Sequence, residues 1–282
     1  MQFIRKKREH GEVVRVNEKN GVTYLSYPKL DAQEGILHGF STRLGGVSEG
    51  IFAGMNLSFT RGDEESAVRE NYHRIADAIG FPYENIVLSD QTHTTNVRLV
   101  TEQDKGNGIT RKKSFFDTDG LITNIPEIVL ATSYADCVPL FFVDPIHRAI
   151  GLSHSGWRGT VGRMGEKTLL QMKEAFGTKP EEVIAAIGPS ICMDCYEVSE
   201  DVADAFSHEF EKDIDKILYA KGHGKYQLDL WRANELVLLD AGILPEHLSI
   251  TDICTCCNPD LLFSHRASHG QRGNMAAFLM LT

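Results

Sequence analysis

The chain has 282 residues, of which 42% are hydrophobic and 24% are charged, and its formal net charge is -10. This acidic balance argues against a nucleic-acid partner and against an acidic membrane surface, because both attract basic proteins, and the apolar runs are too short to span a bilayer. No secretory signal is visible in the first residues, and six cysteines are too few for a disulfide scaffold, so we expect a cytoplasmic protein with reduced thiols.

The predicted elements mix strands and helices without strict alternation, and no linker divides the chain. In chain order, they are strands at Val13–Val16, Val22–Tyr27 and Gly35–Thr42, a helix at Glu64–Ile79, strands at Ile86–Leu88, Val97–Val100, Ile128–Thr132, Val138–Val143 and Ala149–Leu152, a helix at Val161–Phe176, a strand at Val183–Ile187, a helix at 199–210, a strand at Tyr226–Leu228, a helix at Asp229–Ala241, and strands at Leu248–Asp252 and Met275–Leu281. We therefore expect one α/β (α+β mixed) domain over residues 1–282, with mixed β-sheets flanked by helices.

Three residues that border these strands carry the chemistry of interest: His93 in SDQTHTTN, Cys137 in SYADCVPL and His154 in GLSHSGWRG. Two imidazoles and one thiolate form a three-ligand zinc set that leaves a fourth position for water or substrate. Their wide spacing matches no compact zinc finger, which favours a catalytic site over a structural one. Taken singly, they have ordinary alternatives: a surface loop histidine, a buried apolar thiol and a histidine that precedes a helix.

The other cysteines and two nearby histidines form a second group of candidate metal ligands: Cys192, Cys195, Cys254, Cys256, Cys257, His265 and His269. The first two form a C-x2-C pair, and the histidines are four residues apart. A thiolate-rich zinc site built from this group is an alternative destination for the metal. Two observations count against it: C-x-C-C is not the usual C-x2-C knuckle, and the two cysteine groups are distant in sequence.

Arginines beside glycine or polar segments point to an anionic ligand. Arg43 in TRLGGVS, Arg158 in GWRG and Arg266 are of this kind, and a guanidinium binds phosphate or carboxylate with two donors. A surface salt bridge is the ordinary alternative for each. The segment Asp117–Gly120 reads D-x-D-G, which can bind a metal but is also a common turn.

These segments also carry a family resemblance. In order along the chain, seven of them resemble motifs of the laccase-domain family, also called multicopper polyphenol oxidoreductase or YfiH/YlmD-type proteins: HGFSTRLGGVS (38–48), DQTH (90–93), DTDGLIT (117–123), ADCVPL (135–140), HSGWRGT (154–160), IGPSICMDCYEV (187–198) and CTCCNPDLLFSHR (254–266). The combination of ADC with HSGWRG is specific, and the segments cover nearly the whole chain. The chain departs from the family at His265, where a tyrosine is usual, and near Gln271–Gly273, where a Gly-Arg pair is usual.

The resemblance implies a single α/β domain with a catalytic zinc ion held by His93, Cys137 and His154. It also implies a zinc-dependent purine nucleoside phosphorylase that acts on adenosine, inosine, guanosine and S-methyl-5'-thioadenosine, with adenosine deaminase activity. Under this hypothesis the small-molecule substrates are purine nucleosides and phosphate. Arg43 is expected to hold phosphate, with Arg158 as the second candidate. Asp136 is a candidate proton shuttle in the substrate site through its position next to the cysteine.

Three other functions are kept as alternatives. A copper-dependent polyphenol oxidase is the first, since a His2Cys set also binds Cu2+, although the chain has 11 histidines and no H-x-H pair of the multicopper kind. In the second, Cys137 acts without metal as a nucleophile with His154 as its base, which makes a cysteine hydrolase. The third is a nucleoside-binding protein without catalysis. The oligomeric state is not predicted, because no strongly amphipathic partner helix is evident.

Overall fold

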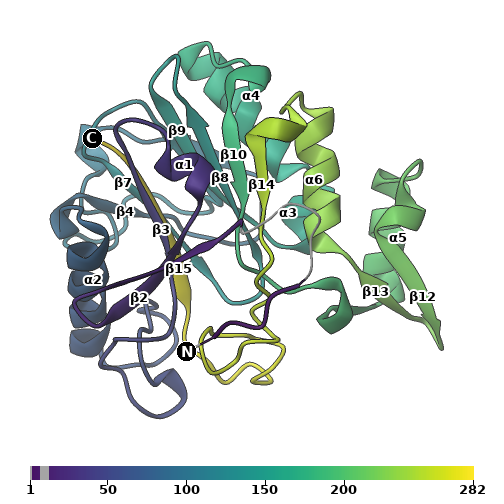
Figure 1. Ribbon diagram of the computed structural model, residues 1–282, viewed down its shortest axis with the longest axis horizontal. Coiled ribbons are helices and arrows are strands. Elements are labelled where there is room, and N and C mark those ends of the chain that lie inside the picture. Colours follow the sequence, from purple (N-terminus) through teal and green to yellow (C-terminus); the bar gives the residue numbers. More distant parts are fainter. Residues whose placement is uncertain (1, 7–12) are drawn as a thin grey trace.

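The computed structural model describes residues 2–6 and 13–282 (Figure 1). Its helices are α1 (Pro28–Asp31), α2 (Glu65–Ile79), α3 (Trp157–Val161), α4 (Met164–Phe176), α5 (Glu200–Glu209) and α6 (Leu230–Asp240). Its strands are β1 (Arg15–Lys19), β2 (Val22–Ser26), β3 (Ile36–Ser41), β4 (Ile86–Leu88), β5 (Val97–Leu99), β6 (Gly120–Thr123), β7 (Val129–Tyr134), β8 (Val138–Asp144), β9 (Ala149–Ser155), β10 (Ile184–Ile187), β11 (Glu197–Ser199), β12 (Leu218–Gly222), β13 (Lys225–Leu228), β14 (Leu248–Ile250) and β15 (Met275–Leu281).

Among the described residues, the strands form two six-stranded sheets and one small three-stranded sheet. The first sheet has the order β1-β2-β3-β15-β7-β4, the second β14-β10-β8-β9-β6-β5, and the small one β11-β13-β12. Both large sheets are mixed, because β4 pairs with β7, β10 with β14, and β5 with β6 in parallel, while the other pairs run antiparallel. The predicted class, an α/β fold with mixed sheets flanked by helices, is confirmed.

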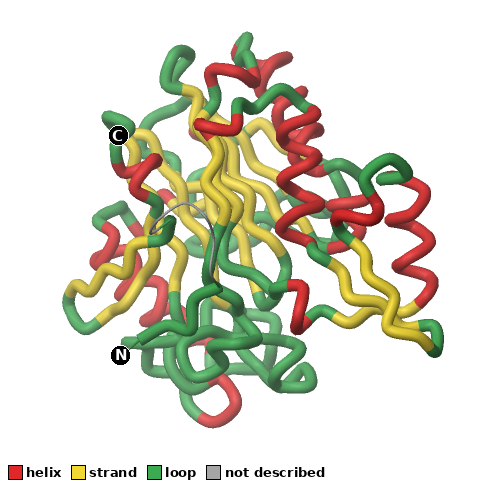
Figure 2. Tube along the Cα trace, turned by 45° about the vertical axis from the view of Figure 1, so that its right-hand side comes forward, coloured by secondary structure: helices red, strands yellow, loops and turns green. Residues whose placement is uncertain are grey.

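The central strand β8 shows how the layers are held together. Its residues alternate between two apolar surroundings: Phe141 and Val143 belong to the core between the two large sheets, and Leu140 and Phe142 to the core under the helices. A strand that is buried on both faces reads as a continuous apolar run, as this one does in the sequence. The helices lie on the outside, with α2 against the first sheet and α4 and α6 against the second (Figures 1 and 2).

Two features lie at the margin of these layers. The small sheet and α5 project from one side of the molecule (Figures 1 and 2). The segment between β14 and β15, residues 251–274, has no regular helix or strand and is called the C-terminal loop below. Because Lys6 donates its backbone N–H to the carbonyl of Asp252, the first described residues run beside the start of this loop.

The element boundaries differ from the prediction at informative places. The first strand begins at Arg15 rather than Val13. The predicted helix at Val161–Phe176 begins later, at Met164, because Arg163 adopts a left-handed backbone with φ of 56°, and the short helix α3 that ends at Val161 was not predicted. Strand β9 continues to Ser155, so that His154 lies within a strand. The strands β6, β11 and β12 were not predicted.

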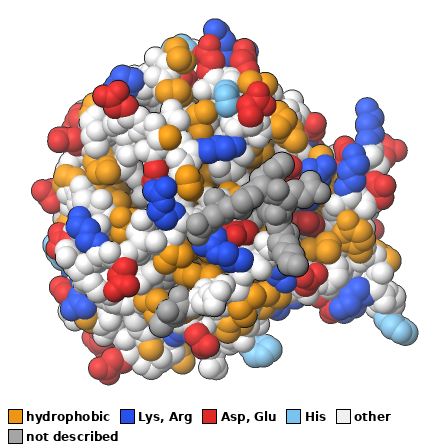
Figure 3. All heavy atoms as spheres, viewed as in Figure 1, with side chains coloured by type: hydrophobic (Ala, Val, Ile, Leu, Met, Phe, Trp, Pro, Cys, Tyr) orange, Lys and Arg blue, Asp and Glu red, His pale blue; other side chains and the backbone are white. Residues whose placement is uncertain are grey.

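The surface carries charges of both signs. On the face drawn in Figure 3, basic and acidic side chains are interspersed with apolar ones over the described part of the chain. Bilayer-crossing helices, which need both length and sustained apolar character, do not occur within residues 2–6 and 13–282.

Candidate metal centre

The structure brings His93, Cys137 and His154 together, and these three residues are called the His2Cys group below. Their ligand atoms all lie within 4.8 Å of one another, and the Cys137 Sγ is 4.0 Å from the His93 Nε2. His93 comes from the loop between β4 and β5, Cys137 from the turn between β7 and β8, and His154 from β9. His154 is buried, the cysteine is half-buried and His93 is exposed, so the group faces solvent from one side.

A single buried carboxylate, that of Asp119, organises the two histidines. Its Oδ1 accepts a hydrogen bond from His154 Nδ1 at 2.7 Å and from the backbone N–H of His93 at 3.2 Å. Its Oδ2 accepts from the backbone N–H groups of Thr92 and Thr94 at 3.0 and 2.9 Å. Because His154 Nδ1 points to a carboxylate, Nε2 is the nitrogen left for a metal, an arrangement that is general for ligand histidines.

This role of Asp119 was missed by sequence reasoning, which left the D-x-D-G segment as a turn or a metal ligand. A ligand histidine usually has a carboxylate partner, but the sequence offers 39 acidic residues and does not say which one lies opposite. The pairing of β6 with β9 determines which carboxylate lies opposite His154, because it aligns Gly120 with Ser153 and so places Asp119 beside His154.

The backbone around the group has unusual conformations. His93 and Asp136 have φ values of 66° and 86°, in the left-handed region that residues with a Cβ rarely adopt. Such conformations cost about 1–3 kcal/mol each and cluster at functional sites. Gly156 contributes a close approach, since a Cβ there would lie 3.0 Å from the His93 Cδ2 and 3.1 Å from the Cys137 Sγ.

The group is polarised even without a metal. Burial opposes ionisation of Cys137, but His154 and then His93 outweigh it and lower the pKa of the thiol from 9.0 to about 6. Burial likewise opposes protonation of His154, but the thiolate of Cys137 and the carboxylate of Asp119 raise the pKa of this imidazole to about 9. The thiol is therefore held as the thiolate, which is the form that binds metals.

The donor set fits zinc. Tetrahedral zinc places a thiolate sulfur and an imidazole nitrogen about 3.6 Å apart, given the usual Zn–S and Zn–N bond lengths. The observed distance of 4.0 Å between Cys137 Sγ and His93 Nε2 is a few tenths of an ångström longer. Three donors of this kind leave one tetrahedral position facing the solvent side of the group.

Asp136 lies next to the cysteine and is tied to the C-terminal loop. Its Oδ1 accepts a hydrogen bond from Thr255 Oγ1 at 2.6 Å, and its Oδ2 accepts from the backbone N–H of Arg266 at 2.7 Å. The Arg266 guanidinium in turn donates to the carbonyl of Glu197 at 2.9 Å. The side chain of Asp136 is thus positioned by a segment that follows it by more than a hundred residues.

The two arginines expected to hold phosphate have other contacts. The Arg43 guanidinium donates to the carbonyls of Ala53 and Pro259 and lies 4.6 Å from the centre of the Phe263 ring. Arg158 is exposed, and its guanidinium lies 4.2 Å from the ring centre of its own neighbour Trp157. Neither guanidinium is in hydrogen-bond contact with the His2Cys group.

Arg272, which the sequence did not single out, is a stronger candidate for binding an anion. Only 8% of it is exposed, and its Nε has no hydrogen-bond partner among the described residues. Burial and then repulsion by Arg61 lower the pKa of this guanidinium to about 10, while the charges of Asp136 and Cys137 act in the opposite direction. The available signal was an arginine next to Gly273, in the stretch 271–273 where the chain departs from the family pattern.

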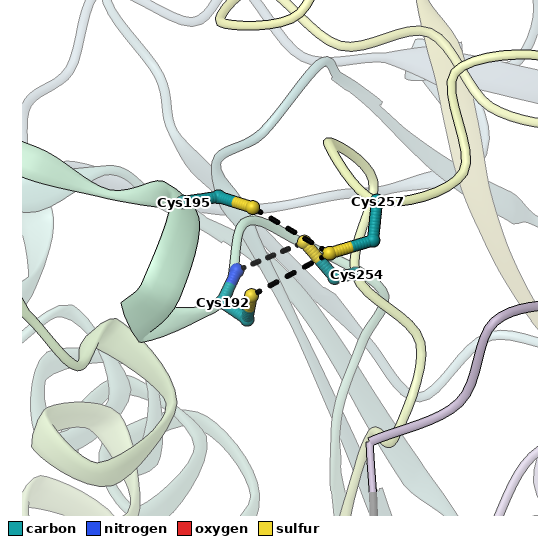
Figure 4. A group of neighbouring side chains, drawn as sticks. All are labelled: Cys192, Cys195, Cys254 and Cys257. Atoms are coloured by element: carbon teal, nitrogen blue, oxygen red, sulfur yellow. Dashed lines mark hydrogen bonds between the residues drawn. The ribbon is translucent and has the colours of Figure 1, made fainter.

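The second group of candidate ligands is only partly assembled. Four of the thiols lie within 4.8 Å of one another: Cys192, Cys195, Cys254 and Cys257, called the four-cysteine cluster below. Their side chains point toward one another in Figure 4. Cys256, His265 and His269 are not members of this cluster, and His265 instead lies with its Nδ1 3.4 Å from the Arg272 Nη2.

A mixed α/β fold with three metal-type donors around an open position is typical of a metal-dependent enzyme. The chain belongs to the family described as multi-copper polyphenol oxidoreductase laccase, whose model matches residues 37–282. The family predicted from the sequence motifs is therefore confirmed.

Individual relatives extend over most of the chain. A protein of Bacillus subtilis (strain 168), named purine nucleoside phosphorylase YlmD, is 37% identical over 245 residues, which cover 86% of this chain and 88% of that protein. A protein from an unknown prokaryotic organism, named adenosine deaminase RL5, is 32% identical over 246 residues. These residues cover 86% of this chain and 94% of that protein. The crystal structure of the hypothetical protein YfiH from Bacillus licheniformis has a TM-score of 0.89 at 31% identity, covering 95% of this chain and 99% of that one. The names of the first two are those of enzymes, in agreement with the prediction of an enzyme.

Proposed function

We propose that this protein is a zinc-dependent purine nucleoside phosphorylase that acts on adenosine, inosine, guanosine and S-methyl-5'-thioadenosine, and that it also deaminates adenosine. The observation that carries the proposal is the convergence of His93, Cys137 and His154 around one open position, with Asp119 fixing both histidines. The relatives named purine nucleoside phosphorylase and adenosine deaminase support the choice of reactions.

In this proposal the His2Cys group is both the metal site and the catalytic centre. Zinc bound there supplies Lewis-acid chemistry and makes water a nucleophile near neutral pH. Asp119 holds His154 in one tautomer and orientation, so that its Nε2 faces the centre. The low pKa of Cys137 keeps the sulfur anionic, and the thiolate would also favour a transition state with positive charge on the sugar.

Asp136 is the proposed proton carrier for the deamination. Ammonia leaves as a neutral molecule only if its nitrogen gains a proton, so a nearby acid–base group is needed. Both carboxylate oxygens of Asp136 already accept one hydrogen bond each, from Thr255 and from the N–H of Arg266. Because a carboxylate has about four acceptor sites, each oxygen can still exchange a proton with the substrate.

Phosphate needs a cationic contact, and Arg272 is the arginine that best meets this need. Its buried Nε has no partner among the described residues, and a buried donor without a partner costs about 1–3 kcal/mol until an acceptor arrives. Arg158 is exposed and free to reorient, and it stays the second candidate. Arg43 would contribute only by releasing the carbonyl of Ala53 or Pro259.

The proposal is tested by phosphate-dependent release of free base from inosine and adenosine with the zinc-loaded protein. Release that needs phosphate and is lost in His154→Ala is the expected result. Cys256→Ala is the matched control, because it removes a thiol outside the His2Cys group. If zinc binds but no base is released with any of the four nucleosides, the phosphorylase assignment is wrong.

The alternative of a copper-dependent polyphenol oxidase is favoured by the description of the family and by the His2Cys donors, which also suit copper. It predicts oxygen uptake with a phenol in proportion to bound copper. Measured beside base release on the same preparation, this assay separates the two functions.

We also propose a cytoplasmic location. All six cysteines are free, and both groups of thiols need reduced sulfur to bind a metal. A reducing compartment maintains that state.

A further inference from the structure

The four-cysteine cluster has the dimensions of a closed tetrahedral zinc site. The Sγ of Cys257 lies 3.9 Å from that of Cys192 and 3.5 Å from that of Cys195, and all four sulfurs lie within 4.8 Å of one another. A zinc ion with four thiolates at the usual Zn–S length has sulfurs about 3.8 Å apart. The four sulfurs therefore need only small shifts to bind zinc.

The spacing of the ligands also fits zinc better than the sequence alone suggests. In the sequence, Cys254, Cys256 and Cys257 form an unusual C-x-C-C run. Cys256 contacts Cys195 but is not one of the four thiols that all lie close to one another, so the ligand pair is Cys254 and Cys257, which is C-x2-C. With Cys192 and Cys195, the cluster consists of two C-x2-C pairs from two turns, a pattern that is typical of structural zinc sites.

Disulfide bonding explains the arrangement less well. In a disulfide each sulfur has one partner, whereas the Cys257 sulfur is shared between Cys192 and Cys195 (Figure 4). The backbone N–H of Cys192 donates to the sulfur of Cys254 at 3.2 Å, a contact that stabilises a ligand thiolate. The Arg266 guanidinium donates to the carbonyl of Cys195, and Lys6 forms an ion pair with Asp194, so cations flank the excess negative charge.

We propose that the four-cysteine cluster binds a second, structural zinc ion that fastens the C-terminal loop beside the His2Cys group. Cys192 and Cys195 lie in the turn before β11, and Cys254 and Cys257 lie in the loop. With all four positions filled by sulfur, this ion has no place for a substrate and serves to hold the two segments together.

The fastening reaches the neighbourhood of the catalytic cysteine through Thr255. This residue lies between the two loop ligands, donates its backbone N–H to the carbonyl of Ser190 and donates its hydroxyl to Asp136 at 2.6 Å. Asp136 directly precedes Cys137. Loss of the second zinc is therefore expected to loosen the loop and the contact that positions Asp136.

The test counts zinc by native mass spectrometry in a His154→Ala background. This background lacks a ligand of the His2Cys group, so the result does not depend on the proposed function. One zinc ion per chain is expected, falling to none when Cys257→Ser is added and staying at one when Cys256→Ser is added. Absence of zinc in the background protein expressed in zinc-supplemented medium, or equal zinc in both cysteine variants, would overturn the proposal.

Cobalt substitution provides a second test that keeps all four cysteines, so it does not depend on whether a cysteine variant folds. In the same His154→Ala background, cobalt(II) bound by four thiolates gives strong sulfur-to-metal charge-transfer absorption and intense visible bands of a tetrahedral ion. These bands are expected, together with four cysteines that resist alkylation until a chelator is added. A mass lower by two or four hydrogen atoms, one pair for each disulfide formed, together with no cobalt uptake would show disulfides and contradict the proposal.

The fastening itself is tested by amide hydrogen exchange of the C-terminal loop. Residues 251–274 are expected to exchange faster in the folded Cys257→Ser protein than in Cys256→Ser, while the strands of the two large sheets keep their protection. Unchanged exchange in a zinc-free, folded variant would show that the ion does not hold the loop.

Discussion

The two thiol-containing groups differ in how the chain surrounds them. The His2Cys group draws its three donors from three segments, includes an exposed histidine and has left-handed backbone at His93 and at the neighbouring Asp136. The four-cysteine cluster draws four identical donors from two short turns, and two of its cysteines are buried. An incomplete, solvent-facing set of donors suits a reaction, whereas a complete set suits the joining of two segments. The number of donors, more than their chemistry, separates the two roles.

Of the variants that test this difference between the two groups, Cys137→Ala is expected to have the largest effect on activity. Loss of the thiolate removes one of the three metal donors of the His2Cys group, so kcat/KM for phosphorolysis is expected to fall by about 10³-fold or more. Initial rates of base release from inosine, measured at saturating zinc, give the number. Full activity in Cys137→Ala would place the reaction outside the His2Cys group, while Cys256→Ala should retain it.

A low pH can affect the two metal-binding groups directly, and it can also lower the stability of the fold. Between pH 6.5 and pH 4, we expect the loss of stability to come mainly from His38. Burial holds the pKa of this imidazole at about 4, with Asp31 acting in the opposite direction, against 6.5 when it is exposed. Between these values the unfolded chain binds the extra proton and the folded chain does not, so stability is complete above pH 6.5 and declines as the pH falls toward 4. The loss is up to about 3 kcal/mol, or roughly 10²-fold in the folding constant.

Urea unfolding of His38→Gln and wild type at several pH values tests this expectation. The stability of the variant should depend less on pH between 6.5 and 4, whatever the metal content of the two proteins. His208→Gln, an exposed change on α5, is the control and should follow the wild-type curve. Parallel curves for wild type and His38→Gln would refute the assignment of the acid transition to this residue.

A smaller effect, specific to one group, is expected from Asp119→Asn. The amide has one acceptor oxygen in place of two, so it can serve the Thr92 and Thr94 N–H groups or the side of His93 and His154, but not both, and it offers no charged partner to His154 Nδ1. Zinc affinity of the His2Cys group should fall by about 10–100-fold, while the four-cysteine cluster keeps its ion. Competition with a chromophoric chelator measures both affinities. Asp117→Asn is a matched exposed control, and an equal loss in the two variants would argue against the role of Asp119.

The smallest effect concerns the C-terminal loop, which connects the two groups and carries Arg272. Replacement by glutamine, Arg272→Gln, is expected to raise the KM for phosphate about tenfold, the loss of one charged hydrogen bond. Deamination of adenosine uses no phosphate and should keep its kcat/KM within about twofold. Arg272→Lys should recover part of the phosphate affinity. Equal losses in both reactions would mean that the arginine maintains the loop rather than binding the anion.

The sequence predicted what depends on local pattern and failed where distant segments decide. The apolar run of β8 and the helix periodicity of α2 were sufficient for the fold class, and the motifs around His93, Cys137 and His154 were sufficient to select three residues that the structure brings together. The carboxylate that orients His154 was not predicted, because strand pairing between β6 and β9 selects Asp119. Arg43 was expected to hold an anion, but a turn at Ala53 and the loop at Pro259 supply carbonyls to its guanidinium.

The cysteine spacing shows the same limit in another form. Three thiols within four positions allow three different pairs, and only the folded turn decides that Cys254 and Cys257, rather than Cys256, complete a set of four mutually close thiols with Cys192 and Cys195. Similarly, the apolar periodicity of residues 161–176 continues past Gly162, and only the left-handed backbone of Arg163 separates α3 from α4. A periodic apolar pattern cannot reveal that one residue within it has a non-helical backbone conformation.

The left-handed conformations of His93 and Asp136 place different demands on the evolution of this chain. At Asp136 the backbone strain is offset by the hydrogen bonds that the carboxylate accepts from Thr255 and Arg266, so glycine there would also remove contacts of the fold. At His93, glycine would relieve the strain without such a loss, so we expect the imidazole to persist only while the His2Cys group is under selection. A descendant that had lost its activity should therefore be recognisable by glycine or asparagine at position 93 before Asp136, its core or its four-cysteine cluster had changed.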